Sequence, residues 1–431
     1  MERGTLLDVD VEKAVFRGLG LARHDGQVIL VHGAYPGERW RVRVSETGRQ
    51  FLRAEAEEPL RTIAGRRASP CRWFPDCGGC TYQDLAYAEQ LALKRAVLTD
   101  ALTRARVSWP GEIEVIGSPE RAWRTRASLH VETTDAGAHL GLTAGASHRV
   151  IDFDVCLQLS DRVNAVVGAL RAVLRREPGL AARTRRVELA ESQAGDTRIV
   201  AFVGELGPGE LARLAAIGGG IPDLNGLDAV VCQGQRRRFV SLRGETHVSS
   251  TLDGVELRSH VLSFFQANRF LLDALAAQVV RGIPEGGCVL DLYGGVGLFS
   301  LALARRAEQV VCVEGDPFAA EDARANAQRA GQSNVRVVRG DVLRALQSEP
   351  SHRDERIVLD PPRTGLGKGV VQAIALREPA AIVYVSCDPP TLGRDLALFA
   401  AAGYRAQRIA ALDLFPNTFH IETVAQLARV S

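Results

Sequence analysis

Lysine is nearly absent from this chain. Only Lys13, Lys94 and Lys368 occur among 53 lysine and arginine residues, so arginine carries almost all of the positive charge. An arginine bias suits phosphate recognition, but it also follows from genome composition. We favour genome composition because acidic residues are interleaved along most of the chain. The 51 acidic residues leave a formal net charge of +2, which excludes a histone-like polycation and still allows one local basic face.

Several other features are missing. No uninterrupted apolar run is long enough to span a bilayer, and the chain has no internal repeat or low-complexity tract. The first residues, Met-Glu-Arg-Gly, soon turn acidic and do not resemble a signal peptide. With 46% hydrophobic and 24% charged residues, the composition excludes a disordered or collagen-like chain. We expect a monomeric, cytoplasmic protein without a membrane segment.

The length of 431 residues predicts two or three domains. Apolar and polar residues alternate over 9–56 between glycine-containing turns, which predicts a β-barrel of the oligonucleotide-binding kind or another small β-domain. From residue 288 onward, apolar strands alternate with helical segments, which predicts a doubly wound parallel sheet. We therefore predict a barrel at 1–58, a central α+β domain at 59–260, and a Rossmann-like α/β domain at 261–431 on which the helical segment 82–112 packs.

A glycine-rich loop follows the first strand of the predicted parallel sheet. It reads Asp291-Leu-Tyr-Gly-Gly-Val-Gly297, and its glycines let a ligand approach the backbone at the carboxyl edge of the sheet. Glu314 ends the next strand, where a carboxylate can accept both hydroxyls of a ribose. Asp291 would repel a pyrophosphate but suits a cationic methionine group, and Ser300 stands where a dinucleotide loop has its third glycine. These details favour S-adenosylmethionine over a nicotinamide dinucleotide.

Three motifs near the ends of later strands carry candidate reactive groups. Asp360-Pro-Pro-Arg363 is either a simple strand terminator or a rigid loop that holds a substrate base. Cys387 follows the fifth strand in Ser-Cys-Asp-Pro, where a thiolate could attack an electrophilic carbon. Glu422 lies among apolar neighbours in the segment 415–422. It is either structural or, beside a reactive thiol, a base whose pKa is raised by burial.

These groups together suit one reaction. C5 of uracil is a poor nucleophile, but a thiolate that adds to C6 converts the ring to an enolate that can accept a methyl group. A base must then remove the C5 proton so that the thiol can leave. The reaction needs one cysteine, one base and S-adenosylmethionine, and the sequence offers Cys387, Glu422 and the loop that begins at Asp291.

The order of these motifs resembles the RNA uracil-5-methyltransferase family. The segment Gly-Leu-Gly-Leu-Ala-Arg at 18–23 is similar to the TRAM β-barrel of that family, so the resemblance covers nearly the whole chain. It implies an RNA substrate, an S-adenosylmethionine-dependent methyltransferase domain, Cys387 as nucleophile and Glu422 as the base. Arg363 would help on the substrate side. The implied cofactor contacts are Gln266, Tyr293, Glu314, Asp341 and, near both cofactor and base, Asp360.

The remaining cysteines divide by position. Cys71, Cys77 and Cys80 flank a Gly-Gly pair, a grouping that in a reducing compartment binds metal more often than it forms disulfides. With Cys156 they resemble the iron–sulfur ligand set of the branch that modifies ribosomal RNA. By ligand type alone, four thiolates fit zinc or a [4Fe–4S] cluster, and unliganded cysteines are the alternative. Three others lie in apolar strands and are expected to be buried: Cys232, Cys288 and Cys312.

Two residues depart from the pattern of the family. Gly294 stands where a cysteine is common, which should matter little. Asp388 stands where asparagine is common, and we expect its carboxylate to raise the pKa of the neighbouring thiol and slow attack.

Three other functions are alternatives. A cytosine-5 enzyme is disfavoured because Arg363 occupies the place of its second cysteine. An iron–sulfur RNA-binding protein without methyltransferase activity is disfavoured because Cys387 and Glu422 are intact. A transfer RNA uracil-5-methyltransferase is the nearer alternative, and the cysteine set favours ribosomal RNA. The six arginines of 171–186 are either a solvated face or a surface that contacts RNA.

Overall fold

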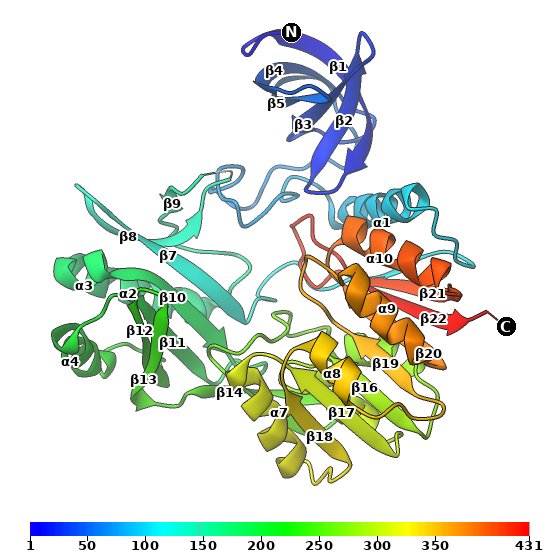
Figure 1. The fold of residues 1–431 in the computed structure, drawn as a ribbon. Coiled ribbons are helices and arrows are strands. Elements are labelled where there is room, and N and C mark those ends of the chain that lie inside the picture. The colour runs from blue at the N-terminus through cyan, green and yellow to red at the C-terminus, as the bar shows by residue number, and fades with distance from the viewer. Residues whose placement is uncertain (146, 431) are drawn as a thin grey trace.

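The computed structural model describes residues 1–145 and 147–430 (Figure 1). An N-terminal barrel stands at the top of the view, a central sheet domain lies at the left, and the C-terminal domain lies at the lower right. Over the described residues, no helix is both long enough and apolar enough to cross a membrane.

The N-terminal strands close into a barrel in the order β1-β2-β3-β5-β4. The alternation of the sequence turns Ile29 and Val31 of β3 inward, where both are fully buried. Outside, the Arg41 guanidinium donates to Asp8 (3.0 Å) and to Glu58 (2.6 Å), so part of the arginine charge of this domain is already paired. The predicted barrel is confirmed. Its strands are β1 (Leu6–Val15), β2 (Leu19–His24), β3 (Gln27–His32), β4 (Arg39–Thr47) and β5 (Phe51–Arg61).

The central domain is a seven-stranded sheet in the order β13-β12-β11-β10-β7-β8-β9. Its three helices pack on one face, over apolar side chains such as Leu129, Val187 and Phe202. The alternate residues of the same strands point to the opposite face. The elements are β7 (Arg126–Thr134), β8 (Gly137–Thr143), β9 (Val150–Ile151), α2 (Asp161–Arg176), α3 (Pro178–Arg183), β10 (Thr184–Glu191), β11 (Arg198–Gly204), α4 (Pro208–Gly218), β12 (Gly226–Gln233) and β13 (Arg236–Gly244).

The arginine run of 171–186 lies on this domain and is largely paired. Arg171 and Arg175 both bind the carboxylate of Asp152. Arg185 pairs with Glu205, so much of the charge of the run is neutralised locally. These pairs favour a structural, solvated face over an RNA-binding one for this run.

A hairpin of β14 (His247–Leu252) and β15 (Val255–His260) leads into the C-terminal sheet, whose order is β18-β17-β16-β19-β20-β22-β21-β6. The five strands β16 to β20 are parallel, as the alternating pattern predicted. Strand β22 runs antiparallel to both β20 and β21. The elements are α5 (Leu272–Arg281), β16 (Cys288–Leu292), α6 (Leu298–Ala304), β17 (Gln309–Glu314), α7 (Pro317–Arg329), β18 (Val335–Arg339), α8 (Val342–Ser348), β19 (Arg356–Leu359), α9 (Lys368–Leu376), β20 (Ala381–Ser386), α10 (Pro389–Ala401), β21 (Tyr404–Leu412) and β22 (Glu422–Arg429).

Two segments from the middle of the chain join the C-terminal domain. Strand β6 (Glu114–Ile116) pairs in parallel with β21 at the sheet edge. Helix α1 (Tyr87–Arg104) lies beside α10 (Figure 1). Gly393 makes this approach possible, since a Cβ there would come within 3.1 Å of the Ala101 carbonyl oxygen. Strand β6 thus extends the sheet that carries the candidate site, and helix α1 packs beside it.

Candidate active site

The glycine-rich loop after β16 shapes the carboxyl edge of the C-terminal sheet. Tyr293 has φ of +63°, a left-handed conformation that costs energy for a residue with a side chain and recurs at ligand sites. Gly294 is required here because a Cβ would lie 2.5 Å from Cys312 Sγ. The departure of Gly294 from the family pattern therefore has a local explanation: Cys312, which is fully buried, fills the space.

Carboxylates from three neighbouring strands gather at this edge. Asp291 is fully buried. Its Oδ2 accepts a hydrogen bond from Ser300 Oγ (2.6 Å), while Oδ1 of Asp291 has no hydrogen-bond partner. Burial raises the pKa of Asp291 to about 7. Burial also raises the pKa of Asp360 to about 7, with smaller contributions from the charges of Asp291 and Glu314. Ser300, which broke the dinucleotide pattern, thus serves to hold Asp291. An acidic edge with an unpaired buried oxygen suits a cationic ligand, as the methionine group of S-adenosylmethionine is.

The other candidate cofactor residues surround this edge. Glu314 accepts from the backbone N–H of Gly295 (2.8 Å) and of Asp316 (2.6 Å), which ties the glycine loop to the end of β17. Asp341 is exposed and caps helix α8. Burial and the Asp341 carboxylate raise the pKa of the Tyr293 hydroxyl, so these two side chains lie near each other. Gln266 is buried in the segment that follows β15.

Cys387 and Glu422 come together from the ends of β20 and the start of β22. Burial raises the pKa of Cys387 to about 11, with further contributions from Glu422 and Asp360, while the Arg363 guanidinium lowers it. Burial also raises the pKa of Glu422 well above its usual value, and Asp360 adds to that shift while Arg363 opposes it. The structure therefore brings the thiol, two carboxylates and one cation, all singled out in the sequence, to one place.

His420 is an additional residue of this site. Its Nε2 lies 3.3 Å from Arg363 Nη2, and its ring lies 4.1 Å from that of Phe419. Burial, and to a smaller extent the charge of Arg363, lower the pKa of His420 to about 3. The imidazole is therefore neutral at neutral pH and can accept a hydrogen bond from the Arg363 guanidinium. Strand β22 begins at Glu422, so His420 lies in the segment that leads into it.

Asp388 is not among the main causes of the raised pKa of Cys387, which differs from the expectation. Its Oδ1 accepts from Thr391 N (2.9 Å) as the N-cap of α10, so its charge is directed to the helix N-terminus. The carboxylates that raise the Cys387 pKa are Glu422 and Asp360.

The four remaining candidate cysteines line one small cavity between the loop 71–80 and residues 153–158. Gln158 and Gln83 both donate from Nε2 to Cys80 Sγ, at 2.9 Å and 3.3 Å. Within the described ranges, no group of three or more histidine, cysteine or acidic side chains is arranged to hold a metal ion. The four thiols therefore share one cavity, and Cys80 Sγ accepts two amide donors. The three predicted core cysteines, Cys232, Cys288 and Cys312, are buried.

Comparison with known proteins accounts for this geometry. Residues 262–430 match the family described as tRNA (Uracil-5-)-methyltransferase, and residues 1–56 match the TRAM domain. The chain is 34% identical to the 23S rRNA (uracil(1939)-C(5))-methyltransferase RlmD of Chromohalobacter salexigens, over 98% of this chain and 89% of that one. The chain belongs to the RNA uracil-5-methyltransferase family. The family, the S-adenosylmethionine cofactor and the enzyme class predicted from the motifs are thereby confirmed.

Two further relatives extend the likeness of this methyltransferase. An uncharacterized RNA methyltransferase of Thermotoga maritima is 32% identical over 98% of this chain and 99% of its own. A crystal structure of a Pyrococcus abyssi tRNA (uracil-54, C5)-methyltransferase with S-adenosyl-L-homocysteine has a TM-score of 0.75 and 27% identity, covering 97% of this chain and 100% of that one. The likeness therefore includes the barrel and the central domain as well as the catalytic sheet.

Proposed function

We propose that this methyltransferase modifies C5 of a uridine in 23S rRNA through a covalent adduct between Cys387 and C6 of the base. The convergence of Cys387 and Glu422 is the observation that carries the proposal. Ser386 pairs with Thr423 in the β20–β22 ladder, so the next residues, Cys387 and Glu422, lie at neighbouring strand ends. Asp360 and Arg363 shift the pKa of both. A nucleophile and a base within mutual electrostatic reach are what addition at C6 and proton removal at C5 require.

Each step can be assigned to a residue. The Cys387 thiolate forms a bond to C6, and the electron pair of the C5–C6 double bond shifts toward C5 and O4. S-adenosylmethionine supplies an electrophilic methyl group, which C5 takes while S-adenosylhomocysteine leaves. The Glu422 carboxylate then removes the C5 proton, the double bond re-forms, and the C6–S bond breaks. The products are 5-methyluridine, S-adenosylhomocysteine, the released Cys387 thiolate and a protonated Glu422.

The raised pKa values of Cys387 and Glu422 indicate that the thiol becomes reactive only when the substrate base is bound. The raised pKa of Cys387 keeps the thiol protonated at neutral pH, so the proton must leave as the base enters. The Arg363 guanidinium lowers the pKa of Cys387, and it stabilises the thiolate and the developing enolate oxygen. The raised pKa of Glu422 makes its carboxylate a stronger base once ionised.

The cofactor contacts follow the acidic edge of the sheet. We propose that Glu314 binds the ribose hydroxyls, and that Asp341 and Tyr293 lie on the adenosine side. Gln266 and Asp360 lie toward the methionine and the reacting base. Binding of a ribose would exchange the backbone bonds that Glu314 accepts from Gly295 and Asp316 for bonds from hydroxyl donors.

We further propose that Cys71, Cys77, Cys80 and Cys156 hold a [4Fe–4S] cluster with a structural role. Support comes from the cavity that all four thiols line and from the two glutamine amides that donate to Cys80 Sγ. The cluster would crosslink the loop after the barrel to the central domain, and no step of the methyl transfer uses it.

Ribosomal RNA is favoured over transfer RNA because the curated relatives that name a substrate name 23S rRNA. Transfer RNA is the second candidate because the Pyrococcus abyssi enzyme, which shares the whole fold, acts on tRNA. Unmodified 23S rRNA and tRNA transcripts carrying tritium at uridine C5 would be incubated with S-adenosylmethionine and the enzyme. We expect tritium release from 23S rRNA and none from tRNA. Release from tRNA alone would show that tRNA is the substrate. No release from either RNA would contradict uracil-5 methylation.

A 5-fluorouridine transcript tests the covalent step. Fluorine cannot leave as a proton does, so the adduct should persist as a denaturant-resistant RNA–protein band. Cys387→Ala should abolish the band, whereas Cys232→Ala, which removes a buried thiol of β12 in the central domain, should keep it. A band that survives Cys387→Ala would refute the nucleophile assignment.

A further inference from the structure

The open face of the central sheet meets the C-terminal domain in a groove of about 550 Å³. The groove is lined by Arg186 and Arg237 of the sheet, by Phe264 and Phe265 of the segment after β15, and by Phe318 at the start of α7. This volume lies within the range of small-molecule binding sites. Two of its lining residues, Phe265 and Ala267, flank the candidate cofactor residue Gln266 in the chain.

Register places the groove residues on one face of the sheet. Arg237 pairs with Cys232, and Phe239 pairs with Val230, in the β12–β13 ladder. The residues of β12 that alternate with these, Ala229 and Val231, point to the opposite face of the sheet, where they belong to the core under the helices. Arg238 therefore points to the helix-covered side of the sheet edge, although it is as exposed as Arg237.

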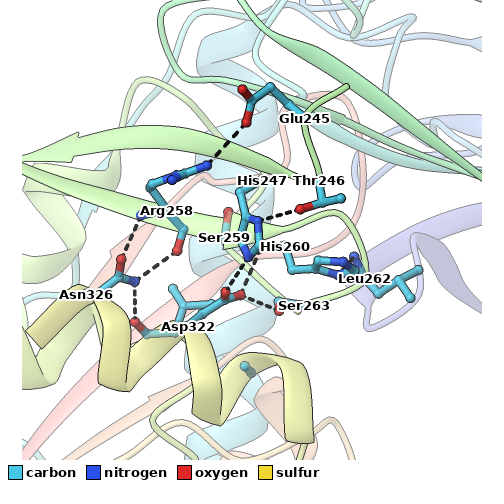
Figure 2. A network of polar contacts seen from close by, with 12 residues as sticks. Glu245, Thr246, His247, Arg258, Ser259, His260, Leu262, Ser263, Asp322 and Asn326 are labelled. Atoms are coloured by element: carbon cyan, nitrogen blue, oxygen red, sulfur yellow. Dashed lines mark hydrogen bonds and ion pairs between the residues drawn. The ribbon is translucent and has the colours of Figure 1, made fainter. Parts of the chain in front are cut away.

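The groove has a rigid aromatic wall. The His260 ring stacks on Phe318 with centroids 4.5 Å apart and an interplanar angle of 10°, and Phe239 meets His260 edge-on at 4.6 Å. Figure 2 shows how this wall is held: Asp322 accepts from His260 N (2.8 Å), from Ser263 Oγ (2.6 Å) and from His247 Nε2 (3.0 Å). The wall is thus fixed to helix α7 before any ligand arrives.

The arginines of the groove differ in how far they are engaged. Arg126 donates to the backbone carbonyls of His260, Val261 and Ser263, and burial lowers its pKa to about 10, so it supports the wall. Arg186 is paired with Glu188. Arg237 is exposed and, among the described residues, forms no ion pair, so its guanidinium is free to meet an anion.

Two carboxylates also line the groove, and both already form hydrogen bonds within the protein. Glu188 binds Arg186 and accepts from Ser128 Oγ (3.1 Å), and Asp316 caps helix α7. Phe264 has 71% of its surface exposed, an unusual state for a large apolar ring beside a cavity. The lining of the groove thus combines an exposed aromatic face with a guanidinium that forms no ion pair, the two kinds of group that hold an unpaired nucleotide by stacking and phosphate contact.

We propose that this groove binds an unpaired nucleotide of the substrate RNA outside the target uridine, with its base against Phe264 and its phosphate on Arg237. The inference rests on the proposed RNA substrate. It adds a second point of attachment on the central domain, next to the segment that carries Gln266. A nucleotide held there would orient the RNA strand before the target base enters the catalytic edge.

Arg237→Gln and Arg238→Gln provide a matched pair, because they remove the same charge from adjacent exposed positions on opposite faces. Binding of an unmodified 23S rRNA transcript would be measured by filter binding at several salt concentrations. We expect Arg237→Gln to raise Kd about fivefold and to reduce the salt slope by about one, with Arg238→Gln within twofold of the parent. Equal effects of the two variants would mean nonspecific surface charge and would overturn the proposal.

Phe264→Leu tests the stacking contact, and Phe270→Leu is its control because Phe270 is exposed away from the groove. We expect Kd for the transcript to rise at least about fivefold for Phe264→Leu and not for Phe270→Leu. S-adenosylmethionine affinity, measured by calorimetry, should stay unchanged in both. Unchanged RNA affinity in Phe264→Leu would contradict the proposed stacking.

These binding measurements do not depend on methyl transfer. If the groove variants bind RNA more weakly than their matched controls but no 5-methyluridine forms, the groove is supported and the proposed function fails. If methylation occurs but the members of each pair bind RNA alike, the groove assignment fails and the proposed function stands.

Discussion

Lys94 of α1 donates from Nζ to Asp413 Oδ1 at 2.6 Å, with both side chains fully buried. The same ammonium donates to the Phe415 carbonyl oxygen at 3.0 Å. Asp413 follows β21 directly, and the chain from Phe415 leads to His420 and Glu422. One of the three lysines of the chain thus ties a helix from the middle of the sequence to the segment that supplies the candidate base.

Replacing this lysine should destabilise the protein. Burial lowers the pKa of Lys94 and Asp413 opposes that shift, so each charge depends on the other. Lys94→Met leaves the Asp413 carboxylate buried and unpaired, which should lower the free energy of unfolding by about 3 kcal/mol. Lys94→Met/Asp413→Leu should recover most of the loss in a urea titration. A double variant as unstable as the single one would contradict an ion pair as the cause.

Asp322 should act as a positioning residue for the cofactor segment. Asp322→Ala removes the acceptor for Ser263 Oγ and His260 N, just before Gln266 in the chain. Loss of two buried hydrogen bonds should weaken S-adenosylmethionine binding about tenfold. Thr246→Ala is the control, because it removes only the bond to His247 Nδ1 (2.8 Å). Calorimetry that shows equal affinities for these two variants would refute the positioning role.

Asp228 should make stability depend on pH. It is fully buried in β12, and neither carboxylate oxygen has a hydrogen-bond partner, so burial raises its pKa to about 6. The folded state therefore holds this proton more tightly than the unfolded chain. The contribution is fully present below about pH 4 and is lost as pH rises to about 6.

Asp228→Asn removes this titration while keeping the shape of the side chain. Relative to the parent, the variant should gain on the order of 1 kcal/mol of stability between pH 4.5 and pH 8. Urea unfolding at both pH values measures the change. A constant difference between variant and parent across this range would show that Asp228 does not titrate there.

The Cys387 thiol should react slowly at neutral pH. Because its pKa is raised to about 11, alkylation of the Cys387 peptide by iodoacetamide should accelerate about tenfold per pH unit from pH 7 to pH 9. Arg363→Gln removes the cation that favours the thiolate and should slow the reaction. Glu422→Gln removes an opposing charge and should accelerate it. Mass spectrometry of that peptide that shows fast, pH-independent labelling would contradict this environment.

The cysteine cavity should yield iron and sulfide in anaerobic preparations. Cys71→Ser should lose most of the iron and the brown colour, since it removes one of four thiolate ligands. Cys232→Ser, a buried cysteine of β12, is the control and should retain both. Zinc without iron in the parent protein would refute the [4Fe–4S] assignment.

Local pattern was sufficient for much of this protein. Alternation over 9–56 predicted the barrel, and the strand–helix rhythm from Cys288 predicted the parallel strands and their loops, because both signals depend only on which face of an element is buried. Cys387 and Glu422 stood out as candidate reactive residues because their neighbours break strands or are apolar. Strand β6 escaped detection because three residues carry no periodicity.

Other features were decided only by tertiary structure. The sequence placed Asp388 beside the nucleophile, but the N-terminus of α10 directs its carboxylate elsewhere. The buried Lys94–Asp413 pair, the contact between Arg363 and His420, and the groove with Arg237 all join segments distant in the chain. Such contacts depend on which faces pack together, and that choice is made by the summed burial of many side chains. The sequence by itself therefore determined the elements and the chemistry, whereas packing decided the charges that surround them.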